Sequence, residues 1–228
     1  MSNNENMSFL QHLEELRWRL VKSAVAVVLV ASVIWYFQET IMVNLFLSMK
    51  EKDFITFRLF CKYFGVCVAD IPVKMQSMTV SGQFSYALMM SFMGGLVLAF
   101  PFIFYQLWSF VKPGLKLKEK KMASGLVFYV SLLFFLGILF GYFLVAPLSV
   151  QFFGSYQISN QIENNFTISS YMSMILSTVF YSGLFFLLPI VSYLLAKLEI
   201  IDVEFLKKYR KHAIVVILIL AAVITPPD

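Results

Sequence analysis

Residues 75–121 read MQSMTVSGQFSYALMMSFMGGLVLAFPFIFYQLWSFVKPGLKLKEKK. The first thirty-seven of these residues, 75–111, carry no formal charge, and five lysines follow between Lys112 and Lys121. A helix needs about 20 apolar residues to cross the hydrocarbon core of a membrane, and Lys and Arg collect on the cytoplasmic side of such helices. The segment therefore predicts a transmembrane helix that ends at the cytoplasmic surface.

The same composition extends over the whole chain. Hydrophobic residues make up 60% of the 228 residues and charged residues 14%, against roughly 45–50% and 25% in soluble domains. The net charge of +5 comes from short basic clusters beside apolar stretches. Positive-inside topology explains these clusters better than nucleic-acid binding does. We therefore expect one membrane domain over residues 1–228, an all-α polytopic integral membrane helical bundle.

The apolar stretches predict five transmembrane helices behind an amphipathic surface helix at 8–19. The spans are expected at about 20–37, 83–110, 122–145, 169–196 and 212–224. The last apolar stretch, 213–224, reaches only about 18 Å as a helix, so it is short for a core of ~30 Å. Thirteen of the eighteen Lys and Arg residues fall on the side that holds the N-terminus, which predicts a cytoplasmic N-terminus.

Residues 39–79 are expected to form a long loop on the external side. Within it, Phe54, Phe57, Cys61 and Phe64 share one helical face, so we expect part of the loop to pack on the membrane surface. Cys61 and Cys67 lie in an oxidising compartment and could form a disulfide. Two packed free thiols would suit the spacing equally well.

The spans carry no Asp, Glu or Arg at mid-depth. Ionisable residues at that depth usually mark a proton or ion path, so their absence argues against a pump or a proton-coupled transporter. The histidines, His12 and His212, both lie at cytoplasmic ends of helices, and no hydrolase, zinc-protease or nucleotide-binding motif occurs. The sequence predicts neither an enzyme nor a bound cofactor or metal.

Two carboxylates stand among the cations of the predicted cytoplasmic face. Glu15 lies in the surface helix, and Glu119 lies in the lysine-rich loop after the second predicted span. Their simplest roles are modest. Glu15 is spaced for an i,i+4 ion pair with Arg19, worth about 0.3–0.5 kcal/mol, and Glu119 relieves repulsion between neighbouring lysines. Residue types alone favour these simple roles.

Four segments together point to a more specific function. They read HLEELRWRL (12–20), FPFIFYQLWSFVKPGLKLKEKK (100–121), GYFLVAPLSVQFF (141–153) and LKKYRKHAIVVILILAAVITPPD (206–228). In this order they closely resemble the TatC family, the multi-spanning receptor subunit of the twin-arginine (Sec-independent) protein translocase. The resemblance implies a protein of the bacterial cytoplasmic membrane that binds the signal peptides of folded cargo, with transport driven by the proton-motive force.

The resemblance also assigns candidate residues. Glu15 and Glu119 match the glutamates that receive the paired arginines of the signal peptide, and Arg17, Gln106 and Phe110 match the family's cytoplasmic recognition surface. The chemistry is reasonable, because a planar guanidinium binds a carboxylate through two bonds and lysine cannot. The implied partners are twin-arginine signal peptides, small single-span TatA/TatB-type subunits, further copies of the chain, and membrane lipid.

Two departures from the family pattern bear on partner contact. The family usually carries a glutamate two residues before a proline in the fourth span; here Leu187 precedes Pro189 at that spacing. That glutamate is associated with docking of the single-span subunits. Family members also continue into a sixth span. The sequence therefore leaves two alternatives open: a truncated or divergent structural stub without transport activity, and, less favoured, a small-molecule transporter.

Overall fold

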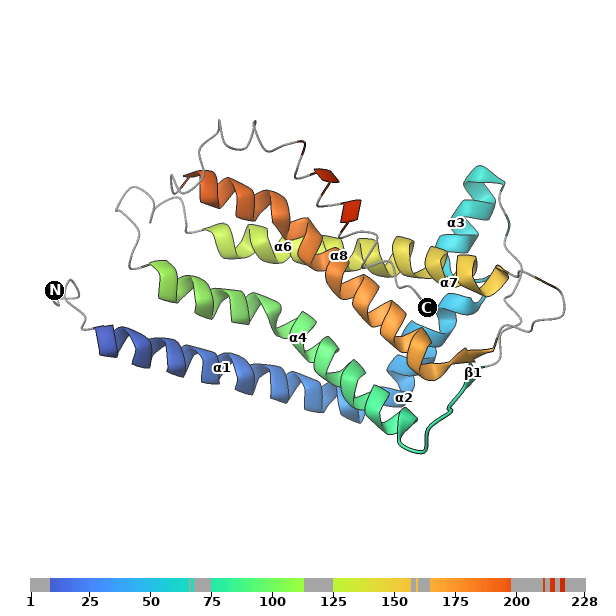
Figure 1. Cartoon of the computed structure of the whole chain (residues 1–228), viewed down its shortest axis with the longest axis horizontal. Helices are drawn as coiled ribbons and strands as arrows, with labels where there is room; N and C mark the ends of the chain where they lie inside the picture. The colour runs from blue at the N-terminus through green and yellow to red at the C-terminus, as the bar shows by residue number, and fades with distance from the viewer. Residues whose placement is uncertain are drawn as a thin grey trace. The chain divides into compact units, whose positions relative to one another are not determined.

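The computed structural model describes residues 9–65, 67, 75–112, 125–156, 159, 165–197, 211, 214–215 and 218–219 (Figure 1). Within these ranges four helices are long and apolar enough to cross a membrane, at Gln11–Tyr36, Gly82–Val111, Leu126–Ser155 and Ile168–Leu194. The expected fifth span, 212–224, lies almost entirely outside the described residues.

The described elements follow one another in the order α1 (Phe9–Tyr36), α2 (Gln38–Ile41), the π-helix η1 (Met42–Phe46), the 3₁₀-helix η2 (Leu47–Lys50), α3 (Ile55–Phe64), β1 (Met75–Gln76), α4 (Gly82–Val111), α6 (Leu126–Phe140), the π-helix η5 (Gly141–Val145), α7 (Ala146–Ser155), β2 (Phe166–Thr167) and α8 (Ile168–Lys197). β1 pairs with β2 in parallel, with Met75 opposite Phe166. The chain forms two compact units, one of residues 1–38 and 88–132 and one of residues 39–87 and 133–228.

The first helix differs from the expectation. We expected a surface helix over 8–19 that turns into a separate span at about residue 20, but α1 runs without interruption from Phe9 to Tyr36. Sharp helix kinks need proline, a Gly/Ser pair, a π-bulge or an inserted group, and α1 contains neither proline nor glycine. The predicted surface helix and the first span are therefore one continuous helix.

In the first unit α1 and α4 run side by side (Figure 1) and approach closely at two glycines of α4. A Cβ added at Gly95 would lie 2.9 Å from the backbone carbonyl oxygen of Val27 and 2.9 Å from the Cβ of Ala31. A Cβ at Gly94 would lie 2.8 Å from Cδ1 of Ile34. Small residues let the backbones of membrane helices approach and gain dispersion contacts, and this contact holds the two helices in register.

The third span was expected to end at residue 145. In the second unit, however, the helical segment that begins in α6 continues past Pro147. It continues through η5 into α7, with Pro147 at the start of α7. Proline has no N–H, so Pro147 donates no backbone bond to the preceding turn, η5, which contains the carbonyl of Phe143. The buried hydroxyl of Thr56 on α3 donates a hydrogen bond to this carbonyl. The hydroxyl therefore supplies one hydrogen bond to the helical turn that precedes the proline.

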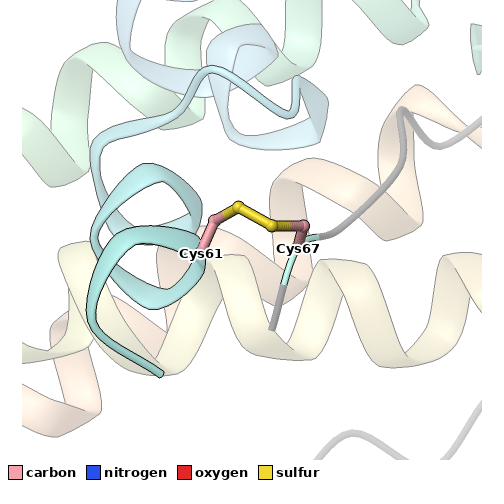
Figure 2. The surroundings of a disulfide bond; sticks show 2 residues. All are labelled: Cys61 and Cys67. Atoms are coloured by element: carbon pink, nitrogen blue, oxygen red, sulfur yellow. A yellow bond between two sulfur atoms is a disulfide. The ribbon is translucent and has the colours of Figure 1, made fainter. Parts of the chain in front are cut away.

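The segment that was predicted to be external packs on the protein itself. We expected the face of α3 with Phe54 and Phe57 to lie on the membrane surface, but the two side chains are only 7% and 2% exposed. The Phe54 ring stacks on that of Phe143 in η5 at 6.3 Å. Cys61 at the end of α3 forms a disulfide with Cys67 (Figure 2), across the turn at Gly65, where φ is 70°. Of the two cysteine states left open above, the structure has the disulfide.

Hydrogen bonds from two tyrosine hydroxyls connect η1 to the long helical segments of the same unit. The Tyr171 hydroxyl of α8 donates to the carbonyl of Phe46 at 2.5 Å, and the Tyr142 hydroxyl of η5 donates to that of Leu45 at 3.0 Å. α6 and α8 meet at glycines, since a Cβ at Gly137 would lie 2.7 Å from the carbonyl oxygen of Ser182. The buried core of this unit is formed by Phe57, Phe134, Val150, Tyr171, Met172 and Ile175.

Candidate functional site

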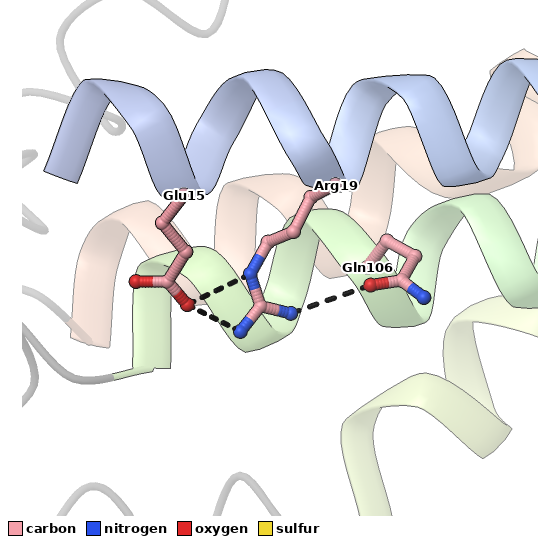
Figure 3. Close-up of polar contacts among 3 residues, drawn as sticks. All are labelled: Glu15, Arg19 and Gln106. Carbon is pink, nitrogen blue, oxygen red and sulfur yellow. Dashed lines mark hydrogen bonds and ion pairs between the residues drawn. The ribbon is translucent and has the colours of Figure 1, made fainter. Parts of the chain in front are cut away.

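The candidate site lies where the first turns of α1 meet the last turns of α4, within the first unit (Figure 3). Arg19 of α1 is its central residue. Its Nε and Nη2 atoms donate to Oε1 of Glu15 at 2.9 Å and 2.5 Å, and its Nη1 atom donates to Oε1 of Gln106 on α4 at 3.3 Å. One guanidinium therefore links a carboxylate on its own helix to an amide on the neighbouring helix.

Helix periodicity explains the first half of this arrangement. Residues four apart share a face, and a glutamate placed N-terminal to its cation is the better orientation for an i,i+4 pair. The close approach of α1 and α4 at Gly94 and Gly95 explains the second half, because it brings the end of α4 within reach of Arg19. The side chains of Arg19 and Glu15 are 22% and 26% exposed, and Gln106 is 8% exposed.

A second contact joins the same two helices one turn further toward their ends. The ring of His12 stacks on that of Phe110, with centroids 4.1 Å apart and planes 17° from parallel. His12 precedes Glu15 by three residues and Phe110 follows Gln106 by four, so both pairs extend the same facing surfaces. Along this face of α1, Glu15 thus lies between His12, which stacks on Phe110, and Arg19, which binds the carboxylate.

The structure brings three of the proposed site residues together, namely Glu15, Gln106 and Phe110. Arg17 is exposed on α1, and residues two apart do not face each other on a helix. Glu119 lies outside the described residues. Leu187 and Pro189 belong to the other unit, where α8 continues through Pro189, and Leu187 is half-buried.

Two contacts of the site were not expected from the sequence. They are the stack of His12 on Phe110 and the bond of Arg19 to Gln106, and the second joins residues 87 positions apart. The available signal was spacing: residues 12, 15 and 19 share a helix face, as do 106 and 110. Nothing in one sequence shows that these two faces meet.

The arrangement offers directional hydrogen bonding rather than metal or acid–base chemistry. Within the described ranges no three His, Cys, Asp or Glu side chains are grouped so that they could hold a metal ion. Glu15 is the partly exposed acceptor of the cluster. An ionised carboxylate has about four acceptor positions on its two oxygens, and both bonds from Arg19 end on Oε1. Figure 3 shows the second oxygen pointing away from Arg19.

Comparison with known proteins gives a consistent result. The family model described as Sec-independent protein translocase protein (TatC) matches residues 11–228. The Sec-independent protein translocase protein TatC of Blattabacterium sp. subsp. Periplaneta americana (strain BPLAN) is 38% identical, over 100% of this chain and 89% of that protein. Its counterpart in Carboxydothermus hydrogenoformans is 36% identical, over 97% of this chain and 84% of that protein.

A solved structure is also similar. The crystal structure of the twin-arginine translocase receptor TatC in DDM superposes with a TM-score of 0.75 at 29% sequence identity, covering 95% of this chain and 89% of that one. This likeness confirms the predicted polytopic helical membrane fold.

Proposed function

The chain belongs to the TatC family of Sec-independent protein translocase proteins, and from this premise we propose that it is the receptor subunit that binds twin-arginine signal peptides. It is a multi-pass protein of the bacterial cytoplasmic membrane and a translocase component, not an enzyme. In the proposed role it recognises folded proteins by their signal peptides for export across the membrane, and the proton-motive force drives the transport.

One observation carries the proposal: the Glu15 carboxylate is held in place by Arg19 and is still partly exposed. The geometry supports guanidinium recognition, because a guanidinium of the chain itself already binds this carboxylate. An arginine of the peptide would bind the second oxygen of Glu15, and Glu119 would receive the other arginine of the pair. Charge-assisted hydrogen bonds of this kind contribute roughly 1.5–3 kcal/mol each.

The chemistry of the arginine side chain explains why the proposed site would bind an Arg-Arg peptide in preference to a Lys-Lys peptide. A guanidinium presents a rigid planar set of donors, whereas the lysine ammonium is a strongly hydrated point charge. A carboxylate held in place, as that of Glu15 is, therefore favours arginine by geometry. At a headgroup boundary the interaction is also less screened by salt than it would be between fully exposed charges.

Peptide binding by the full chain in lipid nanodiscs tests the proposal. We expect a labelled Arg-Arg signal peptide to bind more tightly than its Lys-Lys counterpart, and Glu15→Gln to weaken Arg-Arg binding by at least about tenfold, which corresponds to about 1.4 kcal/mol. Glu14→Gln is the matched control, because Glu14 is the adjacent residue on the same helix and is exposed. Equal affinities of the native chain and Glu15→Gln for the Arg-Arg peptide would refute the role of Glu15.

The proposed partners in transport are the small single-span TatA/TatB-type subunits, other copies of this chain and membrane lipid. Leu187 favours a second candidate function, a structural stub or receptor that does not transport. It puts an apolar side chain where the family usually has a glutamate for partner docking, and it lies half-buried within the continuous helix α8. Complementation of a strain that lacks its own receptor separates the two functions, because a stub would not restore export.

A further inference from the structure

We propose that Arg19 is a positioning residue that sets the preference of the site for arginine over lysine, an inference that rests on the proposed function. Arg19 occupies one oxygen of Glu15 and leaves the other oxygen pointing away from it (Figure 3). The incoming side chain therefore meets a fixed, half-occupied carboxylate and not a mobile, fully available one.

The bonds of Arg19 can be made only by a planar fork of donors. Three of its nitrogen atoms are used, two for Glu15 on α1 and one for Gln106 on α4. Lysine has a single nitrogen at the end of a flexible chain and does not reproduce this arrangement. Gln106 is nearly buried, so its amide oxygen needs a partner inside the protein. Arg19 satisfies that oxygen and anchors the carboxylate to α4 at the same time.

The charge of Arg19 matters as much as its geometry. A carboxylate without a partner attracts any cation, because Coulomb attraction does not distinguish an ammonium from a guanidinium of equal charge. With Arg19 in contact, the Glu15–Arg19 pair has no net charge, and the general attraction is largely cancelled. What remains is the directional acceptor capacity of the second oxygen, which a guanidinium uses better than an ammonium does.

Removal of Arg19 should therefore change selectivity and not only affinity. In Arg19→Gln the carboxylate is mobile and unneutralised, so Arg-Arg peptides lose the fixed geometry while Lys-Lys peptides gain attraction. A residue that merely supports the fold would weaken both peptides alike. This difference is the signature of the proposal.

The experiment measures dissociation constants of labelled Arg-Arg and Lys-Lys peptides for the full chain in lipid nanodiscs. We expect the ratio of the two constants to fall by about tenfold or more in Arg19→Gln, with Lys-Lys binding unchanged or tighter. Lys22→Gln is the control, because it removes an exposed positive charge three residues further along α1. We expect its ratio to equal that of the native chain.

Arg19→Lys keeps the charge but not the fork, and it provides the test if Arg19→Gln does not fold. We expect it to weaken Arg-Arg binding severalfold and to leave Lys-Lys binding weak. Equal losses for both peptides in Arg19→Gln, or unchanged Arg-Arg binding in Arg19→Lys, would overturn the proposal and leave the proposed function intact. A native chain that does not distinguish the two peptides would instead refute the proposed function.

Discussion

Thr56 and Pro147 show how a single hydroxyl can compensate for a helix defect. Pro147 removes one backbone donor from α7, and Thr56, 5% exposed on α3, donates to the carbonyl of Phe143 in the preceding turn. The hydroxyl also joins α3, in the segment predicted to be external, to the membrane-spanning segment. A residue in a predicted loop therefore has a structural role that hydropathy does not indicate.

This contact gives a prediction at the scale of one residue. Thr56→Val keeps the shape of the side chain and removes the part-buried hydrogen bond to the Phe143 carbonyl, which costs about 1 kcal/mol or more. We expect a lower thermal transition for the variant in detergent. Thr56→Ser retains the hydroxyl and should lose less stability. A Thr56→Val protein as stable as the native chain would show that the hydrogen bond is not needed.

The candidate site was predictable only in part at this scale. Glu15, Gln106 and Phe110 followed from their match to family motifs, and the Glu15–Arg19 pair followed from i,i+4 spacing. The stack of His12 on Phe110 was not expected, since it depends on a tertiary contact between two helices far apart in the sequence. Side chains were thus easier to assign to a helix face than to a partner.

At the scale of elements, the packing of α1 on α4 depends on glycine. At Gly95 the nearest groups to an added Cβ include the backbone carbonyl of Val27, which cannot rotate away as a side chain would. Overpacking of a close contact typically costs about 1–3 kcal/mol. Helix positions can be predicted from hydropathy, but the distance between two helices depends on such small residues.

Gly95→Val should therefore push α1 and α4 apart. We expect it to lower thermal stability and also to weaken Arg-Arg peptide binding, because the bond between Arg19 and Gln106 requires the close approach. Gly125→Ala is a suitable control, since the nearest atom to its added Cβ, 3.3 Å away, belongs to the side-chain ring of Tyr129 and can move. Native-like stability and binding in Gly95→Val would mean that the two helices do not need this contact.

The positions of the helices were predicted well where the apolar stretch of sequence was long. The ranges expected at 83–110 and 169–196 lie within α4 and α8. The errors fell where local rules compete with tertiary contacts. The amphipathic pattern at 8–19 suggested a separate surface helix, and the third span was expected to end at residue 145, two residues before Pro147. In the structure, α1 is continuous from Phe9, and the helical segment continues through η5 and past Pro147 into α7.

At the scale of the whole molecule, the positions of the membrane-spanning helices and the orientation of the chain are inferred from different features of the sequence. Hydropathy locates the spans, and four are present among the described residues. Orientation comes only from the distribution of Lys and Arg, and it stays a prediction. It matters for function, because signal peptides reach the receptor from the cytoplasm and the proposed site must face that side.

The two cysteines allow a direct test of the orientation. The Cys61–Cys67 disulfide belongs to the segment predicted to be external, and disulfides persist in the oxidising compartment outside the cytoplasmic membrane. In Cys61→Ser, the freed thiol of Cys67 should react with a membrane-impermeant maleimide in intact spheroplasts. Glu14→Cys, made in a Cys61→Ser/Cys67→Ser background, should react only after permeabilisation, because Glu14 is exposed on the end of α1 predicted to face the cytoplasm. The reverse pattern would place the candidate site on the external side, where signal peptides of cytoplasmic proteins could not reach it.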